Sequence, residues 1–372
     1  MRLSTITMQT KILCVSGARP NFMKLAPLIR EMQDDPAFNP VLVHTGQHYD
    51  DRMAGQFFRD LKMPPPAHNL EVGSGSHAQQ TAEIIKRFEP VVLSEQPHAV
   101  LVVGDVNSTV ACALVAKKLL VPVVHVEAGL RSFDRSMPEE INRVLTDAIS
   151  DLLLVTEESG RRNLLAEGIA PQRIHLVGNL MIDSLRLNVE TARQSGIDVR
   201  LGLSDRRFGL VTLHRPANVD DPDQLRGILG ALAEIAKSCP LYFPVHPRTR
   251  ARIESMQFST AAALTLLEPL GYLDFLCLMS RSSIVLTDSG GIQEETTALG
   301  IPCLTLRTNT ERPVTVEEGT NILAGTTPAS ILKAWDQMNA DPKIGRIPRY
   351  WDGAAAGRCL AALKEFFANS PN

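Results

Sequence analysis

Residues 11–29, KILCVSGARPNFMKLAPLI, contain the pattern that decides the fold. The run KILCV is apolar and short, which predicts a buried β-strand, and the polar SGARPN after it is typical of a loop. Phe22, Leu25 and Ile29 then recur at helical spacing and mark one face of a helix. The stretch therefore predicts a strand, a loop and a helix in that order, which is the opening of a βαβ unit.

The same alternation of strand and helix recurs along the chain. Further strands are expected at 41–45, 99–103, 121–126 and 152–155, and a second set at 210–213, 241–245, 283–287 and 302–306. Strands that are apolar on both faces are typical of parallel sheets covered by helices. We therefore expect an α/β protein with two Rossmann-like domains whose parallel sheets face a cleft, because ligands of such folds bind at the carboxyl ends of the strands. The expected domains are 1–185 and 186–353, with a C-terminal helix at about 354–372 packing back on the first.

The composition excludes several classes of partner. The net charge is -3 and the aromatic fraction is 5%, which gives no support to nucleic-acid binding. No apolar run of about 20 residues is present, so we expect no membrane span. The N-terminal MRLSTITMQT does not fit a signal peptide, and the six cysteines form no C-x-x-C pair. We therefore expect a cytoplasmic protein.

Polar residues gather where the predicted strands end, and one such cluster is Asp288-Ser289-Gly290-Gly291. It follows the strand SIVLT and precedes the helix IQEETTAL. Glycines let backbone N–H groups approach an anion, and the helix N-terminus adds partial positive charge, so a phosphate or diphosphate fits here. Glu295 lies one turn inside the helix and can accept two ribose hydroxyls. The structural alternatives are an N-cap at Ser289 or Asp288 and a surface acid at Glu295.

A second strand-to-helix loop carries Arg19 and Lys24. Positive charge near the start of a helix suits a diphosphate, and the structural alternative is a pair of solvated surface cations. The loop lacks the G-x-G-x-x-G pattern, so a nicotinamide dinucleotide has no support.

Three carboxylates are candidates for proton transfer. Glu127 follows the strand VPVVHV, Asp105 follows AVLVVG, and Glu139 lies in PEEINR. A half-buried carboxylate can have the raised pKa that proton transfer needs. The structural alternatives are an ion pair of Glu127 with Arg131, a helix N-cap at Asp105, a capping box from Ser136 to Glu139, and an ion pair of Glu139 with Arg143.

Three histidines, His125, His214 and His246, stand at predicted strand ends. A hydrogen-bonded core histidine is the structural alternative for each of them. His125-x-Glu127 lacks the P-C-x-x-C partner of the zinc deaminases, and His44 and His48 are separated by a turn glycine. We therefore expect no metal.

These groups fit a nucleotide-diphosphate sugar as the ligand. Helix ends and cations can stabilise a departing diphosphate, and carboxylates can move protons and stabilise an oxocarbenium-like transition state. The residues alone leave two reactions open, which are glycosyl transfer and elimination of the nucleotide with chemistry at the sugar.

Ordered motifs between residues 11 and 363 resemble those of the non-hydrolysing UDP-N-acetylglucosamine 2-epimerases. They are GARP-x-x-x-K, GDVNST, HVEAGLRSFDRSMPEEINR, TLHRPANVDD, HPRTR, GYLDF, TDSGGIQEE and RTNTERP. The family fold is similar to that of the GT-B glycosyltransferases, and members are often homodimers. The resemblance implies an isomerase that converts UDP-N-acetylglucosamine (UDP-GlcNAc) to UDP-N-acetylmannosamine (UDP-ManNAc) for polysaccharide biosynthesis. UDP is eliminated to give a 2-acetamidoglucal and then added back, and no cofactor is needed.

The resemblance also implies roles for the candidate residues. Asp105, Glu127 and Glu139 match the acid/base and cation-stabilising groups, and His214 matches a histidine at the diphosphate and sugar. Glu295 matches the ribose acid and Phe275 a uracil-side contact. The candidate substrate-binding residues are Arg19, Lys24, Arg131, His246, Phe275, Ser289, Gly290, Gly291, Glu295 and Arg312.

Departures from the family pattern leave the sugar open. Asn21 stands where many members have Glu, and Val314 follows Arg-Pro where Glu is usual. A UDP-2,3-diacetamido-2,3-dideoxyglucuronate 2-epimerase and a GT-B glycosyltransferase are the alternatives, and the NTERP segment favours the GlcNAc sugar. HTGQHYD resembles the loop that binds a second, regulatory UDP-sugar, with Gln47 and His48 as candidate contacts.

Overall fold

The computed structural model describes residues 9–17, 19–46, 61, 63–258 and 263–369. The chain divides into unit 1, Met1–Ser184 with Arg349–Asn372, and unit 2, Leu185–Pro348. Among the described residues each unit has one sheet, and the strand pairs in both are parallel. The predicted class, α/β with two parallel-sheet Rossmann-like halves, is thus confirmed.

Within the described residues, the sheet of unit 1 has the strand order β3-β2-β1-β4-β5-β6-β7. Its strands are β1 (Thr10–Ser16), β2 (Phe38–His44), β3 (His68–Asn69), β4 (Ala99–Val103), β5 (Val123–Ala128), β6 (Leu152–Val155) and β7 (Ile174–Leu176). Its helices are α1 (Arg19–Asp34), α3 (His77–Glu95), α4 (Asn107–Lys118), α5 (Pro138–Ile149), α6 (Glu158–Ala166), the 3-10 turn η1 (Pro171–Arg173), α7 (Leu180–Arg193), which runs on into unit 2, and α16 (Ala355–Asn369).

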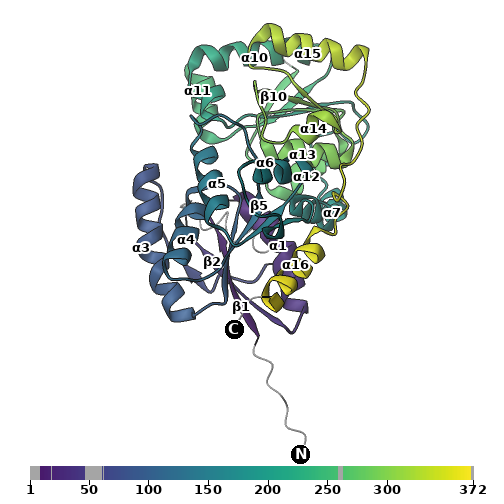
Figure 1. The fold of residues 1–372 in the computed structure, drawn as a ribbon. Helices are drawn as coiled ribbons and strands as arrows, with labels where there is room; N and C mark the ends of the chain where they lie inside the picture. Colours follow the sequence, from purple (N-terminus) through teal and green to yellow (C-terminus); the bar gives the residue numbers. More distant parts are fainter. Residues whose placement is uncertain (1–8, 18, 47–60, 62, 259–262, 370–372) are drawn as a thin grey trace, which may run out of the picture. The chain divides into compact units, whose positions relative to one another are not determined.

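Alternate residues of the unit 1 strands face opposite layers of helices. Leu13 and Val15 join a core with Ile84 and Phe88 of α3 and with the alanine-rich face of α4. The helix α1 packs on β1, β2 and β4, and α16 packs against α1 (Figure 1). The apolar strands are therefore covered by helices, as the continuous apolar runs predict.

Unit 2 repeats this plan with the strand order β10-β9-β8-β11-β12-β13 among the described residues. Its strands are β8 (Gly209–Thr212), β9 (Leu241–Pro244), β10 (Leu264–Leu267), β11 (Ile284–Thr287), β12 (Cys303–Thr305) and β13 (Asn321–Leu323). Its helices are α8 (Ile197–Arg200), α9 (Pro216–Val219), α10 (Pro222–Ala236), α11 (Pro247–Ser255), α12 (Tyr272–Arg281), α13 (Gly290–Leu299), α14 (Pro313–Glu317) and α15 (Pro328–Ala340). Proline opens five of these helices, which suits a position where its missing N–H costs nothing.

Each sheet reverses its direction of growth at one place. In unit 1 the chain moves from β1 outward to β3 and then returns to β4 on the other side of β1, and in unit 2 the same happens between β8 and β11. Loops diverge at such a switch point and leave room for a ligand at the carboxyl ends of the two strands. The loops after β1, β4, β8 and β11 are therefore where a site is expected in each unit.

Candidate functional site

In unit 1, three polar side chains converge beside Gly104, the residue that follows β4. Gly104 has a φ of +68°, and a Cβ placed there would lie 3.3 Å from Asn21 Nδ2, 3.8 Å from Lys24 Nζ and 3.9 Å from Glu127 Oε2. Asn21 and Lys24 come from α1, and Glu127 comes from β5. The loops at the switch point thus bring together the Lys24 and Glu127 that the sequence predicted as site residues.

Glu127 has a backbone conformation that L-residues rarely adopt. Its φ is +69°, and the register of β5 against β6 shifts between Val126 and Ala128. A non-glycine residue in the left-handed region costs of order 1 to 3 kcal/mol and is characteristic of functional sites. The side chain is buried and forms an ion pair with Lys24. The bulge therefore directs a buried carboxylate toward a lysine on α1.

Arg131 is held inside unit 1 by two other carboxylates. Its guanidinium lies 2.7 Å from Asp147 and 2.7 Å from Glu167. Burial alone lowers the pKa of Arg131, but Glu167 and Asp147 raise it overall. The predicted alternative of an ion pair between Glu127 and Arg131 is therefore wrong. A substrate contact of Arg131 stays a prediction.

Asp105 is fixed at both its side chain and its backbone. Its carboxylate forms an ion pair with Arg143, and its carbonyl oxygen accepts a hydrogen bond of 2.9 Å from Asn142. The N-cap of α4 is Val106, so the predicted alternative of an N-cap at Asp105 is wrong. About 29% of the Asp105 side chain is exposed, so the carboxylate can meet a ligand.

Glu139 lies half-buried in the first turn of α5. The N-cap of α5 is Met137, and the hydroxyl of Ser136 donates to Asp134, so the predicted capping box from Ser136 to Glu139 is wrong. Arg143 pairs instead with Glu140 at 2.7 Å and with Asp105. Neither the predicted capping box nor the predicted ion pair with Arg143 therefore accounts for Glu139, and its role at the sugar stays a prediction.

His125 is fully buried, and both of its ring nitrogens have partners. Nδ1 lies 2.6 Å from Asp147 and Nε2 lies 2.8 Å from the carbonyl oxygen of Gly104. Asp147 also accepts a hydrogen bond from the backbone N–H of Gly129. Burial alone raises the pKa of Asp147, but His125 and Arg131 lower it overall. The structural alternative for His125, a hydrogen-bonded core histidine, is therefore confirmed.

In unit 2, β8 and β11 end in a histidine and aspartate pair. His214 Nδ1 lies 2.9 Å from the buried Asp288, which also accepts the backbone N–H groups of His214 and Arg215 and the amide of Asn218. Burial alone raises the pKa of Asp288, but the hydrogen bond and charge of His214 lower it overall. The His214 side chain is 60% exposed. The aspartate orients the ring and leaves the imidazole accessible to a ligand.

Ser289 is the N-cap of α13 and makes no capping hydrogen bond with its side chain. The predicted alternative of an N-cap at Ser289 is therefore confirmed for its position, although the side chain makes no capping hydrogen bond. An N-cap at Asp288 is wrong, because the Asp288 carboxylate accepts from the loop after β8. The serine hydroxyl and the N-terminal amides of α13 are available to an anion.

A group of buried charges lies beside the start of α13. Arg312 Nε lies 2.8 Å from Glu294, and its Nη1 lies 2.5 Å from Glu311, which also pairs with Arg307 at 2.8 Å. Burial alone raises the pKa of Glu311, but the arginines hold it far below its usual range. A Cβ on Gly290 would lie 2.5 Å from Arg312 Nη1, so glycine is required for the guanidinium to approach the helix end.

The remaining candidates of unit 2 have different surroundings. Glu295 is buried and accepts a hydrogen bond of 3.3 Å from Tyr272, so the predicted alternative of a surface acid is wrong. Phe275 lies half-buried on α12. His246 is exposed and caps α11 by accepting from the backbone N–H of Arg248, so a core histidine is wrong there.

Two of the other candidates lie at helix starts, and two lie outside the described residues. Arg19 is the first residue of α1. Gln47 and His48, the predicted contacts of a regulatory sugar, lie outside the described residues. Gly291 lies next to Gly290 in the first turn of α13.

The sequence did not indicate that Asp288 is the partner of His214. It also did not indicate that Glu140, Asp147 and Glu311 are the buried carboxylates that pair with the arginines and histidine of the two units. The signal for Asp288 was its place at a strand end in TDSGG. Its pairing with His214 depends on β8 and β11 being neighbours, which the chain order does not reveal.

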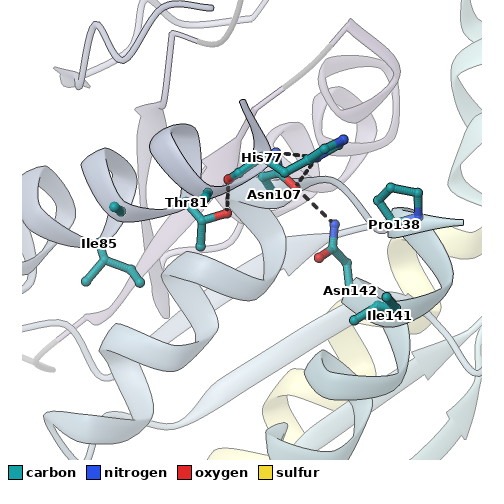
Figure 2. Close-up of a pocket in the computed structure, with 9 residues that line it drawn as sticks. His77, Thr81, Ile85, Asn107, Pro138, Ile141 and Asn142 are labelled. Carbon is teal, nitrogen blue, oxygen red and sulfur yellow. Dashed lines mark hydrogen bonds between the residues drawn. The ribbon is translucent and has the colours of Figure 1, made fainter. Parts of the chain in front are cut away.

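A groove of about 440 Å³ opens between α3, α4 and α5 (Figure 2). Ile85 and Ile141 are among its apolar lining residues, and Figure 2 shows Asn107 and Asn142 pointing toward one another across it. Asn142 donates to Asn107 at 3.3 Å and to the Asp105 carbonyl, so the wall of the groove is linked to the loop after β4.

In the part of the chain that the structure describes, no helix is long and apolar enough to cross a membrane. The same residues contain no group of three or more histidine, cysteine or acidic side chains that could bind a metal ion. The six cysteines are free and buried.

The two parallel units, with a switch point in each sheet, define a GT-B-like α/β protein. Residues 30–364 match the model of the UDP-N-acetylglucosamine 2-epimerase family, and the chain belongs to that family. The resemblance seen in the motifs is confirmed.

Individual relatives agree with this assignment over most of the chain. A UDP-N-acetylglucosamine 2-epimerase of Methanocaldococcus jannaschii is 43% identical over 363 residues, covering 95% of this chain and 98% of the relative. The crystal structure of the Methanocaldococcus jannaschii UDP-GlcNAc 2-epimerase in complex with UDP-GlcNAc and UDP has a TM-score of 0.89 and 40% identity, covering 95% of this chain and 99% of that chain. A UDP-2,3-diacetamido-2,3-dideoxy-D-glucuronate 2-epimerase of Pseudomonas aeruginosa is 43% identical over 319 residues, covering 85% of this chain and 88% of the relative.

Proposed function

We propose that the protein catalyses the reversible C2 epimerisation of UDP-GlcNAc to UDP-ManNAc. The observation that carries the proposal is the pair of carboxylates, Asp105 and Glu127, at the ends of the neighbouring strands β4 and β5, each beside a cation. The proposal is supported by the 43% identity to an enzyme of that name over 363 residues. Paired carboxylates in different environments are the usual means of acid and base chemistry at a sugar.

The proposed reaction proceeds by elimination, because the C2 proton is not flanked by a carbonyl group and is not acidic. The C1–O bond to UDP and the C2–H bond break, and a 2-acetamidoglucal and UDP form. UDP then adds back to C1 while a proton is delivered to the other face of C2. Asp105, Glu127 and Glu139 are the proposed acid/base and cation-stabilising groups, and His214 lies at the diphosphate.

Unit 2 is the proposed binding site for the UDP part. The uncapped amides of α13 at Gly290 and Gly291 suit a diphosphate, and Ser289 and Arg312 add a hydroxyl and a charge. Arg307 Nη1 is buried with no hydrogen-bond partner among the described residues, which a further anionic oxygen would satisfy.

The other proposed binding residues extend this assignment. Glu295 is the proposed ribose acid and Phe275 the uracil-side contact. The remaining proposed substrate-binding residues are Arg19, Lys24, Arg131 and His246. The reaction changes no oxidation state overall, so the proposal includes no redox cofactor.

The second candidate is the epimerisation of UDP-2,3-diacetamido-2,3-dideoxyglucuronate. It is supported by a relative of that name with 43% identity, the same value as the UDP-GlcNAc enzyme of Methanocaldococcus jannaschii. This sugar carries a carboxylate at C6, which needs a further cation. The NTERP segment favours the GlcNAc sugar.

The test is incubation with UDP-GlcNAc in D2O, followed by proton and phosphorus NMR. Deuterium at C2 together with a UDP-ManNAc signal is the expected result. Free UDP with free ManNAc would identify a hydrolysing enzyme instead. UDP binding without any exchange at C2 would reject UDP-GlcNAc as the substrate, and the diacetamido-glucuronate sugar would be tested next, ahead of a glycosyltransferase.

We also propose that the protein works as a cytoplasmic homodimer in polysaccharide biosynthesis. The free, buried cysteines support a reducing compartment. Ile141 and Leu145 on α5 are 48% and 50% exposed, and covering such apolar side chains with a second copy would be favourable. Light scattering at micromolar concentration tests the assembly, and a monomer mass would reject it.

A further inference from the structure

The helix α5 buries its charged residues and exposes its apolar ones. Glu140, Arg143 and Asp147 are 2%, 3% and 0% exposed, whereas Ile141 and Leu145 are 48% and 50% exposed. Spacing of three and four residues places the three charges on one face of the helix. A surface helix normally buries its apolar face, so this reversal needs a reason.

Each of the buried charged side chains contacts a loop at the carboxyl edge of the sheet. Glu140 accepts the backbone N–H groups of Ser132 and Phe133, in the loop after β5. Asp147 accepts the N–H of Gly129 and, through His125, is linked to the carbonyl of Gly104. The charged face of α5 therefore fixes the loops that follow β4 and β5.

Arg143 lies at the centre of this arrangement. One amino group forms an ion pair with Asp105, and the other lies 2.7 Å from Glu140. The adjacent Asn142 donates to the Asp105 carbonyl at 2.9 Å and is seen beside Asn107 in Figure 2. The side chain and the backbone of Asp105 are thus held by consecutive residues of α5.

We propose that Arg143 is a positioning residue, which holds the carboxylate of Asp105 in its reactive orientation and is itself held by Glu140. The proposal rests on the proposed function, because it assigns Asp105 to the reaction. A guanidinium that bridges two carboxylates constrains both, and misplacement of a reacting group by about 1 Å can cost about 100-fold in rate. Lysine carries the charge but cannot make the bridge.

The test is a double-mutant cycle on C2 exchange measured by NMR over days. Arg143→Gln is expected to lower kcat about 100-fold with little change in KM or in UDP affinity. In the Asp105→Asn background, the same change is expected to lower kcat by less than about threefold, because the group that Arg143 positions is already lost. Equal factors in the two backgrounds would show a general structural role and overturn the proposal.

One further variant keeps the result decisive. The kcat of Arg143→Lys is expected to be about tenfold higher than that of Arg143→Gln, because lysine restores the charge beside Asp105 but not the bridge to Glu140. If Asp105→Asn has no measurable exchange, equal kcat in the two Arg143 variants would overturn the proposal.

The matched control is Arg281→Gln, which removes a guanidinium 3.0 Å from the buried Asp198 on a different part of the chain. It is expected to leave kcat unchanged. Loss of exchange in the control as well would assign the effect to folding and reject a specific role for Arg143. The wild-type protein is assayed in parallel, so that failure of the wild type rejects the proposed function, whereas an active wild type with unaffected Arg143 variants rejects only this inference.

Discussion

Gly290→Ala is expected to destabilise the protein and to weaken UDP binding, although alanine favours helices over glycine. Gly290 is the first residue of α13 and has no unusual φ. The new Cβ would lie 2.5 Å from Arg312 Nη1, so the guanidinium must retreat by roughly 1 Å to reach an ordinary contact distance. Arg312 is buried and paired with Glu294 and Glu311, so it has little room to do so.

The size of the expected change in the free energy of unfolding follows from two opposing effects. Alanine gains at most about 1 kcal/mol of helix propensity. Loss of one charge-assisted contact, that of Arg312 Nη1 with Glu311, costs about 1.5 to 3 kcal/mol. The expected net loss in the free energy of unfolding is about 1 to 2 kcal/mol, and UDP affinity should fall about 10- to 100-fold if the same guanidinium binds the diphosphate.

Urea unfolding measures the first quantity and calorimetric titration with UDP measures the second. Gly230→Ala in α10 is the control, because a Cβ there meets nothing within 4 Å. It should raise the free energy of unfolding by about 0.5 to 1 kcal/mol and leave UDP binding unchanged. The reasoning is refuted if Gly290→Ala is as stable as the Gly230→Ala control and binds UDP as the wild type does, because Arg312 would then move aside freely.

Four other substitutions test binding, chemistry and stability. Ser289→Ala should weaken UDP binding about tenfold in calorimetric titration, whereas Glu127→Gln should spare binding and remove C2 exchange measured by NMR; equal loss of binding in both would contradict the separation. Asp288→Asn should lower the free energy of unfolding by about 1 to 3 kcal/mol above pH 5. Because His214 depresses the pKa of Asp288 below the unfolded value of about 3.9, this stabilisation is present above that value and lost as the pH falls through the folded pKa, so the difference from wild type should shrink toward pH 3 in urea melts. Asp183→Ala should cost about 1 to 2 kcal/mol in the same melts, because Asp183 accepts the first N–H groups of α16, and an unchanged midpoint would show that the cap is dispensable.

Central strands could be predicted from sequence, and short edge strands could not. The runs AVLVV and LLLV coincide with β4 and β6, because buried central strands are continuous apolar segments. The four edge strands, β3, β7, β10 and β13, were missed. Two to four residues are too few for a periodicity to stand out, and pairing to a neighbouring strand is what defines them.

The candidate site shows the same limit at the level of side chains. Asp105 and Glu127 could be predicted because a charge directly after a buried strand is conspicuous. Their partners could not, because Lys24 and Arg143 come from helices far away in the sequence. The neighbour in sequence, Arg131, was the wrong partner for Glu127. The bulge, with a φ of +69° at Glu127, directs the carboxylate toward Lys24, and Arg131 pairs with Asp147 and Glu167.

Unit 1 is made of two separate segments of the chain, and this sets the order in which the protein can fold as it is synthesised. Unit 2 is continuous from Leu185 to Pro348 and can finish while the ribosome is still translating. Unit 1 begins first, yet it needs Trp351 and α16, whose Cys359 and Leu363 are fully buried, and these emerge last. A premature stop after Pro348 would therefore release a chain with a complete second unit and an open core in the first.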